Sequence, residues 1–349
     1  MPAPSPSIAL PGTVPGAGPQ HIRHINNTMS DLHKFLFEGL PVRGMLVRLT
    51  DSWREVLQRR EASSGYPGPV RELLGEMTAA AVLMQSNIKF NGALVMQIFG
   101  DGPVKMAVVE VQPELHFRAT AKVVGEVPEG ARLEAMLNVH NRGRCAITLD
   151  PRDRQPGQQP YQGVVPLSAM GEEFHALQSI SEVLEQYMRQ SEQLETRLVL
   201  AANDEVAAGL LIQRLPVEGL GNLESKEKQA EAEVLAEGFN RIAHLASSLK
   251  AEELLTLDAE TILHRLFWEE DVRRFEPQQP RFACTCSRER VGSMLKGLGR
   301  EEIDSIVAER GEVEIGCDFC GRQYHFDVVD VGELFTPERD QPPSSTAVQ

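Results

Sequence analysis

Four cysteines near the end of the chain are the residues best suited to chemistry. They form two close pairs, Cys284-Thr-Cys286 and Cys317-Asp-Phe-Cys320. The two-residue spacer lets both sulfurs of the second pair face one ion, and Gly321 permits the tight turn behind them. In the first pair, residues two apart on an extended chain point to the same side. Because thiolates hold zinc in a tetrahedron, the pattern predicts one Zn²⁺ per chain, bound by Cys284, Cys286, Cys317 and Cys320.

The spacing leaves the role of this zinc site open. A permanent structural ribbon fits it, and so does a switch, because zinc-bound thiolates remain nucleophilic and can be oxidised. With only five cysteines in 349 residues, the clustering indicates a metal site in a reducing compartment and not a secreted disulfide scaffold. The fifth, Cys145, lies alone in a predicted strand and is interpreted as a small buried hydrophobe.

The segment around the four cysteines, residues 281–336, is predicted to be a small zinc-binding domain. Helices are expected from Ser287 and over Arg300 to Glu309, with short strands at Glu312 to Ile315 and Tyr324 to Val329. A module of this size is only marginally stable without a cross-link such as a bound metal. Since a structural zinc contributes on the order of 10–16 kcal/mol, the metal is expected to be the main reason that this module folds.

Residues 29–221 carry the signals of a larger α+β domain, with strands joined mostly by tight turns and therefore rich in antiparallel pairs. Asn91-Gly92 predicts a hairpin inside Ile88 to Phe99. The remaining expected elements are strands at Arg43 to Thr50, Val104 to Val111, Phe117 to Val124, Cys145 to Leu149, Tyr161 to Leu167, Arg197 to Ala202 and Val206 to Leu215, and helices at Trp53 to Arg60, Val70 to Ser86, Ala131 to Asn138 and Glu172 to Gln190.

Residues 222–280 are predicted to form a charged helical linker between the two domains. Apolar residues such as Phe239, Ile242 and Leu249 recur at helical spacing and give one narrow stripe, and Asp258 is suited to cap a second helix ending at Phe267. A segment of this kind buries little surface by itself. Its stripe is therefore expected to cover a complementary surface on the first domain and to detach at modest cost.

Charge and terminal composition weigh against several classes of protein. The net charge of −15 argues against nucleic acid as the main partner and against anionic membranes. The Pro-rich residues 1–28 lack the features of a signal peptide and, with residues 337–349, are expected to be disordered. No stretch reaches the roughly 18 apolar residues of a membrane helix.

Ordered motifs along most of the chain resemble the heat-shock protein 33 family of redox-regulated holdase chaperones. The segment from Phe282 to Arg290 (FACTCSRER) resembles the family hallmark FxCxCSRER. Further similar segments are Leu32 to Gly44, Phe99 to Pro103, Tyr161 to Val165, Ser191 to Leu194, Glu252 to Thr256, Glu301 to Ile306 and Cys317 to Gly321. The Pro-rich N-terminal extension and Cys145 lie outside the family pattern.

The resemblance implies a cytoplasmic, ATP-independent chaperone that is not an enzyme. It implies an inactive, reduced, zinc-bound form, and an oxidised form with Cys284–Cys286 and Cys317–Cys320 disulfides, no zinc, an unfolded linker and a homodimeric state. Partly unfolded client proteins would be the partners, bound under oxidative stress.

Two other functions fit parts of the sequence. Cys317-x-x-Cys320 could serve a thiol–disulfide oxidoreductase, although no thioredoxin-like βαβ context surrounds it and two further thiols favour a metal. A zinc-ribbon protein bound to nucleic acid or to the translation apparatus is the second alternative. Against it stands the zinc module itself, in which acidic residues outnumber basic ones.

Overall fold

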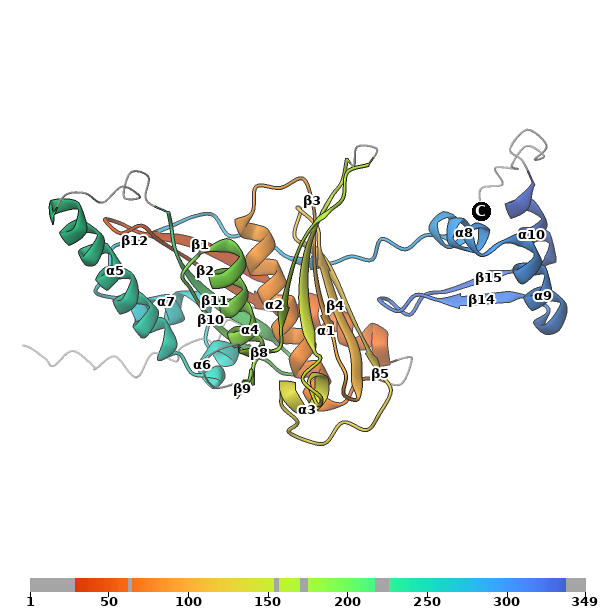
Figure 1. Cartoon of the computed structure of the whole chain (residues 1–349), viewed down its shortest axis with the longest axis horizontal. Coiled ribbons are helices and arrows are strands. Elements are labelled where there is room, and N and C mark those ends of the chain that lie inside the picture. Colours follow the sequence, from red (N-terminus) through yellow and green to blue (C-terminus); the bar gives the residue numbers. More distant parts are fainter. Residues whose placement is uncertain (1–28, 62–64, 154–156, 170–174, 217–225, 337–349) are drawn as a thin grey trace, which may run out of the picture.

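The computed structural model describes residues 29–61, 65–153, 157–169, 175–216 and 226–336. The expected disordered tails, 1–28 and 337–349, lie outside the described residues. The architecture is α+β, with two large antiparallel sheets, helices, and a C-terminal module carrying the cysteine pairs (Figure 1). The predicted fold class is therefore confirmed.

The first sheet, called sheet A, has five strands paired antiparallel throughout. Its central strand reads Val-Arg-Gly-Met-Leu-Val-Arg-Leu and is buried along almost its whole length, as expected for a strand covered on both faces. In spatial order the strands are β10 (Thr196–Ala202), β11 (Ala207–Arg214), β2 (Val42–Leu49), β1 (Asp31–Phe37) and β12 (Val272–Arg274).

The second sheet, called sheet B, has six strands. Its five longer strands pair antiparallel, and β13 pairs parallel with β5. In spatial order they are β13 (Arg281–Phe282), β5 (His116–Val123), β4 (Val104–Val111), β3 (Gly92–Phe99), β6 (Arg144–Pro151) and β7 (Tyr161–Pro166).

One long helix, α2 (Gly68–Asn87), joins the two sheets into one body. It contacts strands of both sheets, and its alanine-rich sequence is buried on most sides. Small side chains let the sheets approach the helix closely, so one continuous core forms around it. The smaller elements of this body are α1 (Asp51–Glu61), α3 (Leu133–Leu137), β8 (Ser168–Ala169), β9 (His175–Ala176), α4 (Ile180–Tyr187) and a π-helical turn at Met188–Glu192.

The far face of sheet A is covered by the linker helices α5 (Lys226–Ser247), α6 (Ala251–Thr256) and α7 (Ala259–Phe267) (Figure 1). A second core forms there between helix residues such as Phe239, Ile262 and Phe267 and strand residues such as Phe35 and Leu46. The side chain of Asp258 accepts a hydrogen bond from Thr261 and caps α7. The prediction that the linker stripe covers a complementary apolar surface of the first domain is confirmed.

The chain then runs from one end of the molecule to the other. After β12 it leaves sheet A, adds β13 to the edge of sheet B, and continues to the C-terminal module (Figure 1). That module packs seven buried residues in a core of its own. Its elements are α8 (Arg288–Leu298), α9 (Arg300–Arg310), β14 (Val313–Gly316), β15 (Gln323–Phe326) and α10 (Val328–Phe335).

Three local predictions were wrong. Asn91-Gly92 does not form a hairpin, because α2 continues to Asn87 and only the residues after Asn91 form a strand. The expected helix from Glu172 begins instead at Ile180, where Ser179 accepts a hydrogen bond from the Glu182 amide and caps it. The expected last strand stops at Phe326, because Asp327 forms a capping box with Asp330 and starts α10.

None of the described helices is both long enough and apolar enough to span a bilayer.

Candidate metal centre

The structure brings the two cysteine pairs together although about thirty residues separate them. Cys284 and Cys286 lie on the extended chain between β13 and α8, and Cys317 and Cys320 lie in the turn between β14 and β15. All four sulfur atoms lie within 4.8 Å of one another. Cys320 is buried and the other three are half-buried, so the cluster is shielded without being closed to small molecules.

The sulfur positions fit a tetrahedral metal site. A tetrahedron with Zn–S bonds of about 2.3 Å has sulfur–sulfur edges of about 3.8 Å. The Sγ atoms of Cys284 and Cys317 are 3.7 Å apart, and those of Cys286 and Cys320 are 3.4 Å apart. These separations are far longer than the roughly 2.05 Å of a disulfide, and all four residues are free thiols. The donor set therefore fits a thiophilic divalent ion.

The turn that carries the second pair is held by backbone bonds. The Gly321 amide donates to the carbonyl of Cys317 at 2.8 Å, and the Cys317 amide donates to the carbonyl of Arg322 at 2.9 Å. Gly321 has φ +70°, a left-handed conformation that costs other residues about 1–2 kcal/mol. The glycine predicted behind Cys320 thus closes the turn that aims both sulfurs at one point.

The sulfurs differ in protonation when no metal holds them. Burial opposes ionisation of Cys286, but hydrogen bonds from Tyr324 and from neighbouring thiols lower its pKa to about 7. Tyr324 Oη donates to this sulfur at 3.1 Å. Burial raises the pKa values of Cys317 and Cys320. Since only thiolates coordinate zinc, metal binding must displace protons from these buried thiols.

The cluster also touches sheet B through Arg118 on β5. The guanidinium carbon lies 4.2 Å from the centroid of the Phe319 ring, and Nη1 lies 3.9 Å from Cys284 Sγ. Glu110 on β4 pairs with the same guanidinium at 2.6 Å. Beside it, Thr120 Oγ1 donates to the Asp318 carbonyl at 2.9 Å. Strand β5 therefore contacts Cys284 of the first pair and, through Phe319 and Asp318, the turn that carries the second pair.

Sequence reasoning missed Arg118, Thr120 and Tyr324. Tyr324 could have been found from the hairpin register, because β15 follows Cys320 directly and its buried positions alternate. Arg118 lies 166 positions from Cys284, and an arginine in a strand gives no local signal of such a contact.

Cys145 and a histidine of the C-terminal module, His325, are not part of the group of clustered metal-ligating side chains among the described residues. Cys145 is fully buried in β6, as expected for a small hydrophobe. His325 lies at the surface, half exposed, with Nδ1 3.3 Å from Glu312.

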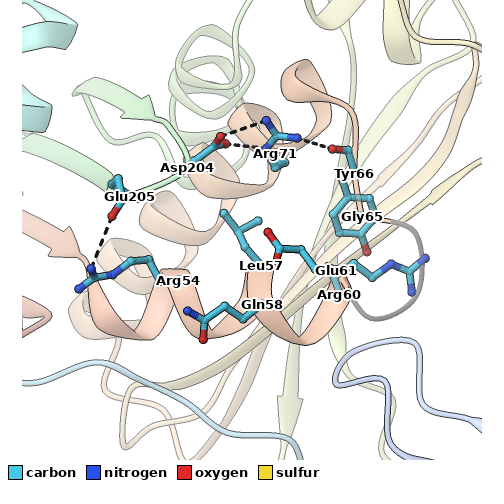
Figure 2. Close-up of a pocket in the computed structure, with 10 residues that line it drawn as sticks. All are labelled: Arg54, Leu57, Gln58, Arg60, Glu61, Gly65, Tyr66, Arg71, Asp204 and Glu205. Carbon is cyan, nitrogen blue, oxygen red and sulfur yellow. Dashed lines mark hydrogen bonds and ion pairs between the residues drawn. The ribbon is translucent and has the colours of Figure 1, made fainter.

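A polar pocket of about 340 Å³ lies beside α1 (Figure 2). It is lined by Arg54, Arg60 and Arg71. Arg71 pairs with both oxygens of Asp204 at 2.5 and 3.1 Å, and Arg54 pairs with Glu205 at 3.5 Å. These ion pairs neutralise much of its positive charge, and none of the described residues that line it is a cysteine.

Comparisons with known proteins agree with this geometry. The family model for Hsp33 protein matches residues 30–327. The "33 kDa chaperonin" of Chromobacterium violaceum is 47% identical over 310 residues, which cover 88% of this chain and 95% of that protein. The same-named protein of Methylobacillus flagellatus is 44% identical over 308 residues, covering 88% and 94%.

A solved structure shares the fold. The crystal structure of the 33 kDa chaperonin from Thermotoga maritima superposes with a TM-score of 0.68 at 21% identity, covering 88% of this chain and 97% of that one.

The two-sheet body, the helical cover over one sheet and the module with four clustered thiols thus occur in a chain whose family model and curated relatives are those of a chaperone. The chain belongs to the Hsp33 family.

Proposed function

We propose that this chaperone is an ATP-independent holdase that oxidation activates, with one Zn²⁺ held by Cys284, Cys286, Cys317 and Cys320 in the reduced form. The observation that carries the proposal is the position of the four-thiol cluster. In the sequence, the cluster comes immediately after the linker, whose helices cover the apolar face of sheet A. A change at the sulfurs can therefore reach the cover through the polypeptide itself.

The bound metal would supply the cross-link that holds two distant chain segments in one module. In the proposed activation, two of the thiolates lose two electrons to hydrogen peroxide, which takes up two protons from the solvent and becomes two waters, and one disulfide forms. Two such steps give Cys284–Cys286 and Cys317–Cys320 and remove all four metal ligands. Each of these disulfides closes a short loop and restrains little of the module.

Loss of the module would shift the linker toward an open state. The cover is held by apolar side chains, each contributing about 1.5–3 kcal/mol. Ordering of its backbone opposes this by about 1–2 kcal/mol per residue. Loss of the anchor at its C-terminal end therefore shifts the equilibrium of the cover toward release. The apolar face of sheet A then becomes available to unfolding client proteins and to a second copy of the chain.

The proposed mechanism assigns a role to each part of the chain. Residues 29–221 form the client-binding and dimerisation domain, 222–280 the releasable linker and 281–336 the switch. The structure adds that β12 and β13 belong to the two sheets, so the linker and the switch are each tied to the first domain by a strand. We place the protein in the cytoplasm, where thiols are kept reduced.

The test pairs two measurements on one sample. Reduced, zinc-loaded protein should suppress the aggregation of a thermally unfolded enzyme poorly. Peroxide with mild heat should release close to one zinc per chain and raise suppression in parallel, as measured by a chromogenic chelator and by light scattering. Cys145→Ala is the matched control and should keep the switch. Equal activity of the reduced and oxidised forms would refute the switch.

A further inference from the structure

The edge of sheet B at β5 is covered by segments from the far end of the chain. β5 pairs with β4 on one side, and on its other side with β13, which has only two residues, Arg281 and Phe282. Backbone groups along a sheet edge are ready to pair with any extended chain, so a long edge must be covered or blunted. Here the cover is short and consists of residues that lead directly into the cysteine cluster.

The covering contacts engage several points along this edge. The Arg281 amide donates to the Leu115 carbonyl at 3.1 Å, and the Ala283 amide donates to the Phe117 carbonyl at 3.0 Å. Farther along, Tyr66 Oη accepts from the Ala121 amide at 3.0 Å. Thr120 is occupied by the carbonyl of Asp318 in the metal-binding turn.

β13 also fills a side-chain site beside the edge. Phe282 lies opposite Phe117 in the register and packs against the main core. The guanidinium of Arg59, from α1, lies 4.9 Å from the centre of the Phe282 ring. The site between α1 and β5 therefore accepts one large apolar or aromatic residue, with a cation over its face.

This arrangement is a strand-addition site occupied by the protein's own chain. Main-chain pairing gives affinity with little sequence preference, and one side-chain site gives selectivity. Cys284 follows Ala283 directly, so the ordering of β13 depends on the ordering of the metal centre. When the cluster loses its shape, a two-residue parallel strand retains few bonds of its own.

We propose that the β5 edge is a second interaction surface, which binds an extended apolar segment of an unfolding protein after β13 leaves. The bound segment pairs parallel with β5 and places a large apolar side chain in the site that Phe282 vacates. This inference rests on the proposed oxidative release, and it adds a surface on the opposite sheet from the linker cover. Unfolding chains suit the site because they offer extended backbone and exposed aromatic residues together.

The chain itself supplies the probe. A fluorescein-labelled peptide of residues 278–286, with Cys284→Ser and Cys286→Ser, should bind full-length oxidised, zinc-free protein and raise its fluorescence anisotropy. Binding to the reduced, zinc-loaded protein should be at least tenfold weaker, because β13 occupies the edge. A second peptide carrying Phe282→Ala should lose at least tenfold in affinity for the oxidised protein.

A variant of the full chain removes the internal competitor. Phe282→Ala should leave the four cysteines intact while weakening β13, so the reduced protein gains measurable peptide binding. Leu298→Ala, which changes an exposed side chain of α8, is the matched control and should behave as the unchanged protein does. Hydrogen exchange of residues 115–122 locates the binding: it should rise on oxidation and fall again when the peptide is added.

The outcomes separate this inference from the proposed function. If oxidised protein suppresses aggregation but does not bind the peptide, or if protection appears away from residues 115–122, the strand-addition site is wrong and the switch stands. If oxidised protein does not suppress aggregation, the proposed function fails. Peptide binding to the reduced Phe282→Ala variant, located at residues 115–122, would then still support the site.

Discussion

Arg118 links the cysteine cluster to the two-sheet body through contacts of three kinds. Its guanidinium stacks on Phe319, approaches Cys284 and pairs with Glu110. The Arg118 and Glu110 side chains are each only 17% exposed, so water screens the pair less than it screens a surface ion pair. A cation at this position also suits the negative charge of four thiolates on a divalent ion.

Arg118→Gln should therefore loosen the metal-binding turn without removing a ligand. Loss of the ring contact and of the charge near Cys284 weakens the docking of the C-terminal module on sheet B by about 0.5–2 kcal/mol of free energy. Peroxide-driven zinc release should accelerate about two- to thirtyfold, measured with a chromogenic chelator. Arg152→Gln, which breaks an exposed ion pair with Glu114 beside the same sheet, is the control. Equal release rates in the two variants would show that docking does not protect the sulfurs.

Cys145 shows how burial separates a structural thiol from the reactive ones. It is fully buried in β6, and burial raises its pKa to about 12. The raised pKa means that the thiol stays neutral in the folded protein up to strongly alkaline pH, whereas an unfolded cysteine ionises near 8.5.

In the folded protein Cys145 should thus resist alkylation by iodoacetamide at pH 8, while the other four cysteines react once the metal is removed. Mass spectrometry of the digested protein gives the modified fraction at each position. Unfolding in guanidinium should make Cys145 react as the others do. Rapid modification of Cys145 in the native state would contradict its role as a packed core residue.

Among the elements, those with a strong local pattern were predicted and those fixed by distant partners were not. The strand over Arg43 to Thr50 and the helix over Val70 to Ser86 carry clear periodicity and were placed within about two residues. The hairpin at Asn91-Gly92 was wrong because the residues before it belong to α2, whose burial between two sheets overrides the turn signal. β12 and β13, with three and two residues, are strands only because an edge accepts them.

In the cysteine centre, too, some features follow from the local sequence and others depend on distant parts of the chain. The four residues that converge could be read from their spacing, since side-chain chemistry and local geometry are both encoded nearby. The surrounding contacts from Arg118 and Thr120 depend on how the module docks on sheet B. Docking of this kind follows from the tertiary fold and leaves no periodic trace in the sequence.

The linker cover can be tested through the aromatic cluster at its C-terminal end. Phe267 on α7 is 3% exposed and lies edge-on to Phe37, with ring centres 5.0 Å apart. Phe267→Ala should cost about 3–5 kcal/mol of packing, which shifts the closed–open equilibrium of the cover about a hundredfold or more. The reduced, zinc-loaded protein should then suppress aggregation measurably.

The neighbouring residue supplies a matched control for this change. Trp268 is 69% exposed, so Trp268→Ala removes a larger side chain without opening the core between the linker and sheet A. It should leave the reduced protein as inactive as before. If both variants were inactive in the reduced state, closure of the cover would not be what limits activity.

At the scale of the whole molecule, the described residues form three cores that contribute unevenly to stability. The core around α2 is the largest and joins both sheets. The second core depends on the linker helices remaining on sheet A. The third has seven buried residues within the C-terminal module, too few to hold it without a cross-link. The parts of the chain should therefore open at different free energies.

Chelation of the metal under reducing conditions should reveal this order, because it removes the cross-link without any oxidation. Hydrogen exchange in residues 288–335 should become rapid, since the third core cannot persist alone. Exchange in residues 239–267 should rise to a smaller extent, because the cover loses its C-terminal anchor but keeps its own packing. Residues 68–111 should remain protected, and adding Zn²⁺ back should restore the starting pattern. If residues 288–335 stayed protected without metal, the module would have its own stability, and loss of zinc could not be what starts the opening of the linker.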